Sequence, residues 1–149
     1  MTDQPSRKRA YAETEVRINL AAAYRLAALG GWDDTIYTHL SATVPGEPGV
    51  YLINEFGLGF DEVCASGLVK VDVQGNVVDG TSRRVNPSGF AIHGAVHAGL
   101  PDVECVLHLH APWGVALGCF VAAFSRRRHG HAAVQAPRPS CVRRACAGG

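Results

Sequence analysis

The spacing of apolar and polar residues predicts helices and strands in alternation along the chain. Ala and Leu dominate residues 13–29, where apolar side chains recur at helical spacing from Val16 to Ala27 before Gly30 and Gly31 end the pattern. Later segments alternate between apolar and polar positions, which is typical of strands. The predicted elements are a helix over 13–29, strands over 35–44, 50–54 and 68–73, a helical turn over 61–66, a helix over 88–98, a strand over 105–110 and a helix over 112–124.

Turn and cap residues separate these elements. The segment 45–49 (Pro-Gly-Glu-Pro-Gly) joins the first two strands into a predicted hairpin, and Gln74-Gly75-Asn76 turns the chain so that Val77 and Val78 pair back. Asn86 and Pro87 are suited to the N-cap and first position of the following helix. Strands interleaved with helices predict a layered α/β domain.

Two histidines lie at the C-terminal end of the predicted strand 105–110, which we interpret as the central, buried strand. His108 and His110 are two residues apart, so a strand directs both imidazoles to the same face. Neutral imidazole binds zinc and similar divalent metals, and a catalytic zinc site usually has three protein ligands. The spacing permits a metal site but does not require one, because such histidines also serve as hydrogen-bonding groups at strand ends.

A second pair, His93 and His97, is four residues apart on the predicted helix 88–98 and therefore shares one face. This spacing also occurs in metal sites. No Glu lies between the two residues as it does in the zinc protease motif, so we favour packing against the sheet or exposure to solvent.

Composition and charge narrow the possible classes of protein. The 149 residues suffice for one domain, and no apolar run is long enough to span a membrane. Residues 1–12 are polar and basic, without the apolar stretch of a secretory signal, and we predict a disordered lead-in. Five cysteines without paired spacing favour a reducing compartment, hence the cytoplasm. Scattered arginines without a motif give no reason to expect nucleic-acid binding.

The charge distribution marks a boundary near residue 120. Residues 1–120 contain 13 acidic and 8 basic residues, a net charge of −5, whereas residues 121–149 contain six arginines and no acid, a net charge of +6. The segment 121–149 is rich in Arg, Pro and Ala and has no regular period, so we predict a disordered tail. Its composition suggests a truncated or frameshifted end of the gene.

The order of several motifs resembles the class II aldolase/adducin family, with small residues typical of the adducin-like branch. The resemblance covers about residues 13–120. It is carried by Thr38-His39-Leu40-Ser41, by the segment 68–77 (Leu-Val-Lys-Val-Asp-Val-Gln-Gly-Asn-Val), by the segment 86–97 that begins Asn-Pro-Ser-Gly-Phe, by the segment 100–103 (Leu-Pro-Asp-Val) and by the segment 106–112 that contains His108 and His110.

The resemblance implies a three-layer α/β/α sandwich around a mainly antiparallel sheet, incomplete at the C-terminus, and an intact family member that assembles as a homo-oligomer, often a tetramer. It also implies a divalent metal, zinc in most members, held by His108, His110 and a later third histidine. Such a metal acts as a Lewis acid on a carbonyl or sugar substrate when a C–C bond breaks.

This chain departs from the aldolase pattern at three places. Gly89 stands where the aldolases have an acidic residue, and glycine has no group that can transfer a proton. The segment Asn54-Glu55-Phe56-Gly57 replaces a phosphate-binding loop, and Glu55 would repel a phosphate. No third histidine of the family pattern follows residue 120. Ser88, Gly57 and Asn54 remain candidate substrate-binding residues, while catalytic residues are not assigned.

Two functions therefore stay open. The first is metal-dependent aldol cleavage, a lyase activity on a small hydroxy-carbonyl or sugar substrate, impaired in this chain. The second is a non-catalytic adducin-like module for oligomerisation or protein binding, of a cytoskeletal kind. Metal content distinguishes the two.

Overall fold

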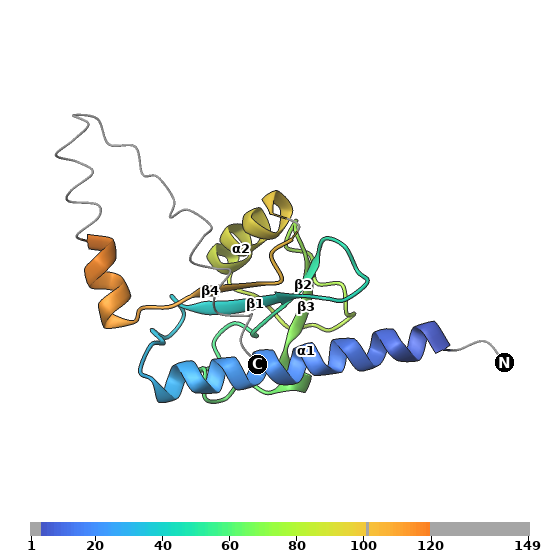
Figure 1. The fold of residues 1–149 in the computed structure, drawn as a ribbon, viewed down its shortest axis with the longest axis horizontal. Helices are drawn as coiled ribbons and strands as arrows, with labels where there is room; N and C mark the ends of the chain where they lie inside the picture. The colour runs from blue at the N-terminus through green and yellow to red at the C-terminus, as the bar shows by residue number, and fades with distance from the viewer. Residues whose placement is uncertain (1–3, 101, 120–149) are drawn as a thin grey trace. The chain divides into compact units, whose positions relative to one another are not determined.

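A computed structural model describes residues 4–100 and 102–119. The chain divides into two compact units, residues 1–109 and 110–149, and the named elements lie in the first. These are α1 (Gln4–Leu29), β1 (His39–Thr43), β2 (Val50–Ile53), the short 3-10 helix η1 (Ala65–Gly67), β3 (Val69–Asp72), α2 (Pro87–Gly99) and β4 (Cys105–His108) (Figure 1). In the second unit, residues 112–119 are helical, as predicted.

The strands of the first unit form a single antiparallel sheet in the order β3-β2-β1-β4. The predicted hairpin is confirmed by the pairing of β1 with β2, and the chain returns after β3 through a bridge between Val71 and Val77. β4 was expected to be central and buried. This was wrong for the part of the chain described, because β4 pairs only with β1, at the sheet edge, and its residues are half-buried or exposed.

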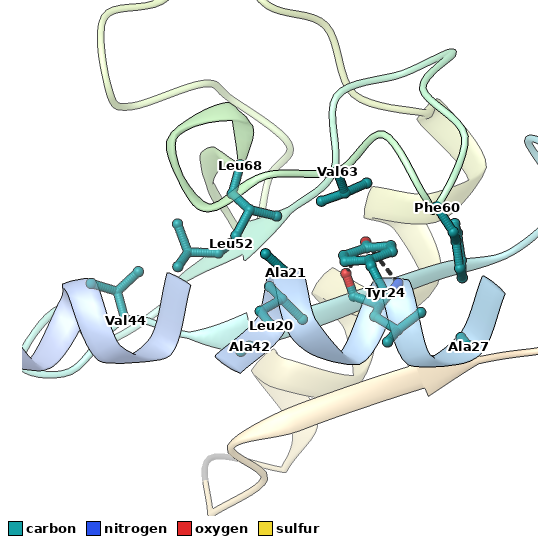
Figure 2. Close-up of a cluster of buried hydrophobic side chains, with 11 residues drawn as sticks. Leu20, Ala21, Tyr24, Ala27, Ala42, Val44, Leu52, Phe60, Val63 and Leu68 are labelled. Atoms are coloured by element: carbon teal, nitrogen blue, oxygen red, sulfur yellow. Dashed lines mark hydrogen bonds between the residues drawn. The ribbon is translucent and has the colours of Figure 1, made fainter. Parts of the chain in front are cut away.

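The two long helices lie on opposite faces of this sheet, which confirms the predicted three-layer α/β/α arrangement (Figure 1). On one face, α1 packs over Leu40, Ala42 and Leu52, with loop residues such as Phe60 closing the cluster (Figure 2). On the other face, a smaller apolar cluster surrounds Tyr51. Alternate residues of β2 therefore contribute to two separate cores, as the two-residue period of a strand requires.

The helix ends follow from local sequence. The Asn86 side chain accepts a hydrogen bond from the Ser88 N–H (3.1 Å), and Pro87 follows the cap, so the predicted start of α2 is confirmed. At the end of α1, Gly31 has a φ of +63°, a conformation that glycine adopts without strain.

Two boundaries differ from the prediction. α1 begins at Gln4 rather than Glu13, so it includes most of the segment 1–12 assigned to a disordered lead-in. Ala, Arg, Lys and Gln in that segment are good helix formers, and Pro5 suits a first turn. β1 begins at His39 rather than Thr35. The Thr38 side chain accepts a hydrogen bond from the Asp34 N–H (2.8 Å), and a turn at this point delays the strand.

Some predictions cannot be compared with the structure. The tail 121–149, the boundary at residue 120 and the end of the last predicted helix lie outside the described residues. Within the described ranges 4–100 and 102–119, no helix is both long and apolar enough to cross a membrane.

Candidate functional site

A cluster of histidines lies where α2 covers β1 and the edge strand β4. His39 of β1 is the direct cross-strand partner of His108 of β4, and their ring centroids are 4.9 Å apart. Directly opposed residues of an antiparallel pair share a face of the sheet. His108, one of the two predicted metal ligands, therefore lies beside a second imidazole that comes from a segment 69 positions earlier in the sequence.

α2 contributes two further histidines to this cluster. His93 and His97 are buried and face the sheet, as the four-residue spacing predicts for one helix face. The ring of His93 lies edge-on to that of His39 (4.7 Å), and the ring of His97 stacks on that of Tyr51 (4.9 Å). Of the two expected arrangements, packing against the sheet and exposure to solvent, the structure shows the first for both histidines.

Hydrogen bonds connect these side chains in a continuous chain. His39 Nδ1 lies 2.8 Å from His93 Nε2, and His93 Nδ1 lies 2.6 Å from Ser41 Oγ. Ser41 Oγ in turn lies 2.8 Å from His97 Nε2. Ser41 and His93 are fully buried, and His97 is nearly so. The hydrogen bonds offset the cost of burying these polar groups, which is large for an unpaired group.

Glycines allow α2 to approach the sheet this closely. A Cβ on Gly89 would lie 3.0 Å from Cδ2 and 3.3 Å from Nε2 of His39, so the imidazole occupies the space of a side chain at position 89. A Cβ on Gly94 would lie 2.9 Å from the Val73 carbonyl oxygen. Both distances are shorter than ordinary van der Waals contacts. Because glycine has no side chain at these two positions, α2 lies close enough to β1 for His93 and His97 to contact it.

Burial keeps the helical histidines uncharged. Burial, reinforced by the neighbouring His39, His97 and His108, lowers the pKa of His93 to about 3. Burial also lowers the pKa of His97, while the Val103 backbone acts in the opposite direction. Both rings are therefore neutral at pH 7, which suits hydrogen bonding through one protonated and one unprotonated nitrogen.

The shift of His93 predicts a loss of stability in mild acid. Because the folded-state pKa lies below the ordinary value of 6.5, the unfolded chain binds more protons, and stability present above pH 6.5 is lost as the pH falls toward 3. At 1.36 kcal/mol per pH unit, we expect a loss of about 2 kcal/mol between pH 6.5 and pH 5 from this residue. Urea unfolding at pH 6.5 and at pH 5 measures this loss of stability.

His93→Gln is the matched variant for that measurement, because glutamine keeps hydrogen-bonding capacity but does not titrate. The free energy of unfolding of this variant should depend less on pH over the same range. An equal slope in both proteins would contradict the assignment of the acid sensitivity to His93.

The other predicted site residues lie in different surroundings. His110 is the first residue of the second unit. The Asn54 side chain contacts the Tyr24 hydroxyl (2.8 Å) and donates to the Glu55 carbonyl (3.3 Å), so it has structural partners. Ser88 is exposed and donates its hydroxyl hydrogen to Asn86 (2.8 Å).

The loop that contains Gly57, a candidate substrate-binding residue, has mixed charges. Gly57 adopts a φ of +96°, and neighbouring Glu55 forms an ion pair with Arg83 (3.4 Å). A carboxylate at this point disfavours a phosphate group, although its arginine partner reduces the effect. Substrate binding by Ser88, Asn54 and Gly57 stays a prediction.

The described residues offer suitable donor atoms for zinc but not a complete ligand set. No group of three His, Cys, Asp or Glu side chains in ranges 4–100 and 102–119 is arranged to hold a metal ion. His39 and His93 direct nitrogens at one another at 2.8 Å, whereas two imidazoles on a tetrahedral zinc, with Zn–N near 2.0–2.1 Å, place their nitrogens about 3.3 Å apart. That contact is a hydrogen bond.

Neither His39 nor Ser41 was predicted from the sequence to belong to the site. A signal was present, since Thr38-His39-Leu40-Ser41 alternates polar and apolar residues and His93 and His97 interrupt an otherwise apolar helix. The pairing of these segments, however, depends on contacts between residues far apart in the chain.

Comparison with known proteins agrees with this fold. Residues 18–144 match the family described as Class II Aldolase and Adducin N-terminal domain. The chain is 55% identical over 106 residues to the "Putative aldolase class 2 protein" of Caulobacter vibrioides, covering 71% of this chain and 41% of that protein. It is 48% identical over 107 residues to alpha-adducin of Mus musculus, covering 70% and 15%.

Solved structures of class II aldolase proteins also resemble this chain. An aldolase II superfamily protein from Pseudomonas syringae has a TM-score of 0.67 at 55% identity, covering 71% of this chain and 43% of that one. The L-fuculose 1-phosphate aldolase from Glaciozyma antarctica has a TM-score of 0.66 at 31% identity, covering 80% and 48%. The chain thus spans less than half the length of these relatives, and it belongs to the class II aldolase and adducin N-terminal domain family.

Proposed function

We propose that this chain carries the N-terminal part of a metal-dependent lyase that cleaves a small hydroxy-carbonyl or sugar substrate by an aldol-type reaction. The proposed metal is a divalent ion, zinc before others, and its ligands are His108 and His110. The observation that carries this proposal is the pairing of His39 with His108, which brings the first histidine of the His-x-His motif beside a group of buried histidines. A bound metal would polarise the substrate carbonyl.

The surroundings of His108 suit such a role. Neutral imidazoles bind zinc, whereas protonated ones do not, and burial keeps His93 neutral near His108. Ser88, Asn54 and Gly57 are the proposed substrate contacts. Glu55 favours an unphosphorylated substrate. Because the described residues do not supply a three-ligand set, we expect impaired activity in this chain by itself.

Zinc binding by the intact chain tests the proposal. We expect zinc to be retained after dialysis in the unaltered protein and its affinity to fall at least about tenfold in His108→Ala, a change of about 1.4 kcal/mol. Metal analysis and calorimetric titration measure both. Leu107→Ala is the matched control, because it changes the neighbouring residue, on the opposite face of β4, and should leave zinc binding unchanged.

A second function is favoured by one specific observation. The His39 imidazole fills the space beside Gly89, so an acidic side chain of the aldolase kind does not fit there without a rearrangement. We propose as the alternative a non-catalytic, adducin-like module that acts through oligomerisation or protein binding. The 48% identity to alpha-adducin supports this alternative.

The two functions predict different outcomes. A folded, metal-free protein that forms a tetramer in analytical ultracentrifugation supports the adducin-like module, and zinc that is lost in His108→Ala supports the lyase. For either function we propose a cytoplasmic location. It is supported by the free thiols of Cys64 and Cys119 among the described residues, since such thiols persist in reducing compartments.

A further inference from the structure

Residues 112–119 form a helix whose surroundings differ from those of α1 and α2, which cover the sheet (Figure 1). Every residue of this helix is exposed, although its sequence, Pro-Trp-Gly-Val-Ala-Leu-Gly-Cys, contains no charged side chain. Trp113, Leu117 and Val115 are 88%, 62% and 48% exposed. A helix that is apolar on all sides is ordinarily buried in a core or in lipid. The exposure of this one therefore indicates a surface that binds an apolar partner.

The sequence that follows this helix is strongly basic. Uncharged residues continue as far as Ser125, and three consecutive arginines, Arg126, Arg127 and Arg128, come next. The segment 121–149 contains six arginines and no acidic residue, a net charge of +6. An exposed apolar helix and a polybasic segment are thus adjacent in the sequence, and a partner that satisfies both must combine apolar material with negative charge.

A lipid surface with anionic headgroups provides both kinds of contact. Its acyl region accepts apolar side chains, and its headgroups attract arginine. Tryptophan is favoured at the boundary between the two regions, because its ring is apolar and its N–H group is polar. The eight residues of the helix are about 12 Å long, much less than the roughly 30 Å of a bilayer core, so the helix is suited to lying in the surface.

Two other partners fit these observations less well. Pairing of the helix with a second copy of this chain would bring two segments of charge +6 together, and like charges repel. A nucleic acid would attract the arginines through its phosphates, but a phosphate backbone offers no apolar region to Val115 and Leu117. An anionic lipid surface agrees with both the exposed helix and the charge of the segment.

We propose that helix 112–119 and the arginines of segment 121–149 form a peripheral binding site for anionic lipid surfaces. The helix places its apolar side chains below the headgroups, while the arginines contact the negative groups of the headgroups. Stable attachment to a membrane ordinarily takes two signals of this kind, so both parts are needed. The sheet and the proposed metal ligands take no part in this contact, which therefore does not depend on the proposed function.

Tryptophan fluorescence of the full chain tests the proposal, because the chain has two tryptophans, Trp32 and Trp113. Trp32→Phe leaves Trp113 as the reporter. We expect its emission to shift to shorter wavelength when vesicles of phosphatidylcholine and phosphatidylserine are added, since the indole moves from water into the headgroup region. Trp113→Phe is the matched control. The remaining Trp32, whose ring lies against Gly30 at the end of α1, should keep its emission.

A second pair of variants tests the apolar contact by vesicle sedimentation. Leu117→Gln should weaken binding to the phosphatidylserine vesicles roughly tenfold, because one leucine side chain no longer leaves water. Leu29→Gln is its control, since Leu29 is 85% exposed but belongs to α1, and this change should leave the affinity unaltered. Equal affinities of the two variants would overturn the role of the helix.

The role of the arginines is tested in the same assay. We expect binding to be at least about tenfold weaker with phosphatidylcholine alone, in about 1 M salt, and in the triple variant Arg126→Gln, Arg127→Gln, Arg128→Gln. Equal binding to neutral vesicles would overturn the proposal, as would equally tight binding of an RNA oligonucleotide. Short-wavelength emission of Trp113 without vesicles would show that protein already covers the helix, and it too would overturn the proposal.

Discussion

Replacing Tyr24 by alanine should lower the free energy of unfolding by about 4 kcal/mol, the largest effect that we expect from one substitution. Tyr24 is fully buried between α1 and the sheet, and its ring packs edge-on against Phe60, with centroids 4.6 Å apart (Figure 2). Truncation removes the ring and leaves a cavity that the surrounding helix and strands cannot fill by small movements.

The hydroxyl of Tyr24 contributes separately from its ring. It accepts hydrogen bonds from the N–H groups of Leu40 (2.9 Å) and Asn54 (3.2 Å), and it donates to the Leu40 carbonyl. These contacts connect α1 to the start of β1 and the end of β2. Tyr24→Phe keeps the ring but leaves buried backbone groups without a partner, so we expect a loss of about 2 kcal/mol.

Urea unfolding followed by circular dichroism measures both variants of Tyr24. Tyr37→Phe is the matched control, because the Tyr37 side chain is 62% exposed and its change should alter stability by about 0.5 kcal/mol or less. Equal stabilities of Tyr24→Phe and the unaltered protein would show that the hydroxyl contacts do not hold α1 in place.

A methyl group added at Gly94 should lower the free energy of unfolding by about 3 kcal/mol. The new Cβ would lie 2.9 Å from the Val73 carbonyl oxygen, a backbone atom. The Val73 N–H donates to the Gly49 carbonyl (3.1 Å), so this segment is held in place and α2 must move away instead. The shift would also separate His93 from Ser41.

Gly99→Ala is the control for Gly94→Ala. Gly99 belongs to the last turn of the same helix, and a Cβ there meets no atom within 4 Å. Alanine is the better helix former, so this variant should be more stable by about 0.5 kcal/mol. Thermal unfolding of the two variants gives the comparison. If Gly94→Ala also gains stability, α2 does not pack against the sheet as closely as the structure indicates.

Local sequence was sufficient to predict most of the elements. The start of α2 follows from Asn86 and Pro87, and the hairpin of β1 and β2 follows from the turn between two alternating segments. The position of His93 and His97 on one face of α2 also follows from their spacing. These features depend on residues within a few positions of one another, and physical rules for caps, turns and periodicity apply at that range.

The start of β1 and the place of β4 could not be predicted in this way. A turn stabilised by Thr38 shortens β1, and the apolar character of residues 105–109 suggested a central strand although β4 pairs with one neighbour only among the described residues. An apolar pattern indicates that a strand contacts a core. It does not indicate how many strands lie beside it.

The sequence alone determined the kinds of side chain available: paired histidines, a glycine at position 89 and helices with apolar faces. Only the tertiary structure decided that His39 lies opposite His108, and that Ser41 connects His93 to His97. The reason is that strand register and the packing of a helix on a sheet are set by contacts between distant segments. Chain spacing fixes which face a residue is on, but the partner across that face is chosen by the fold as a whole.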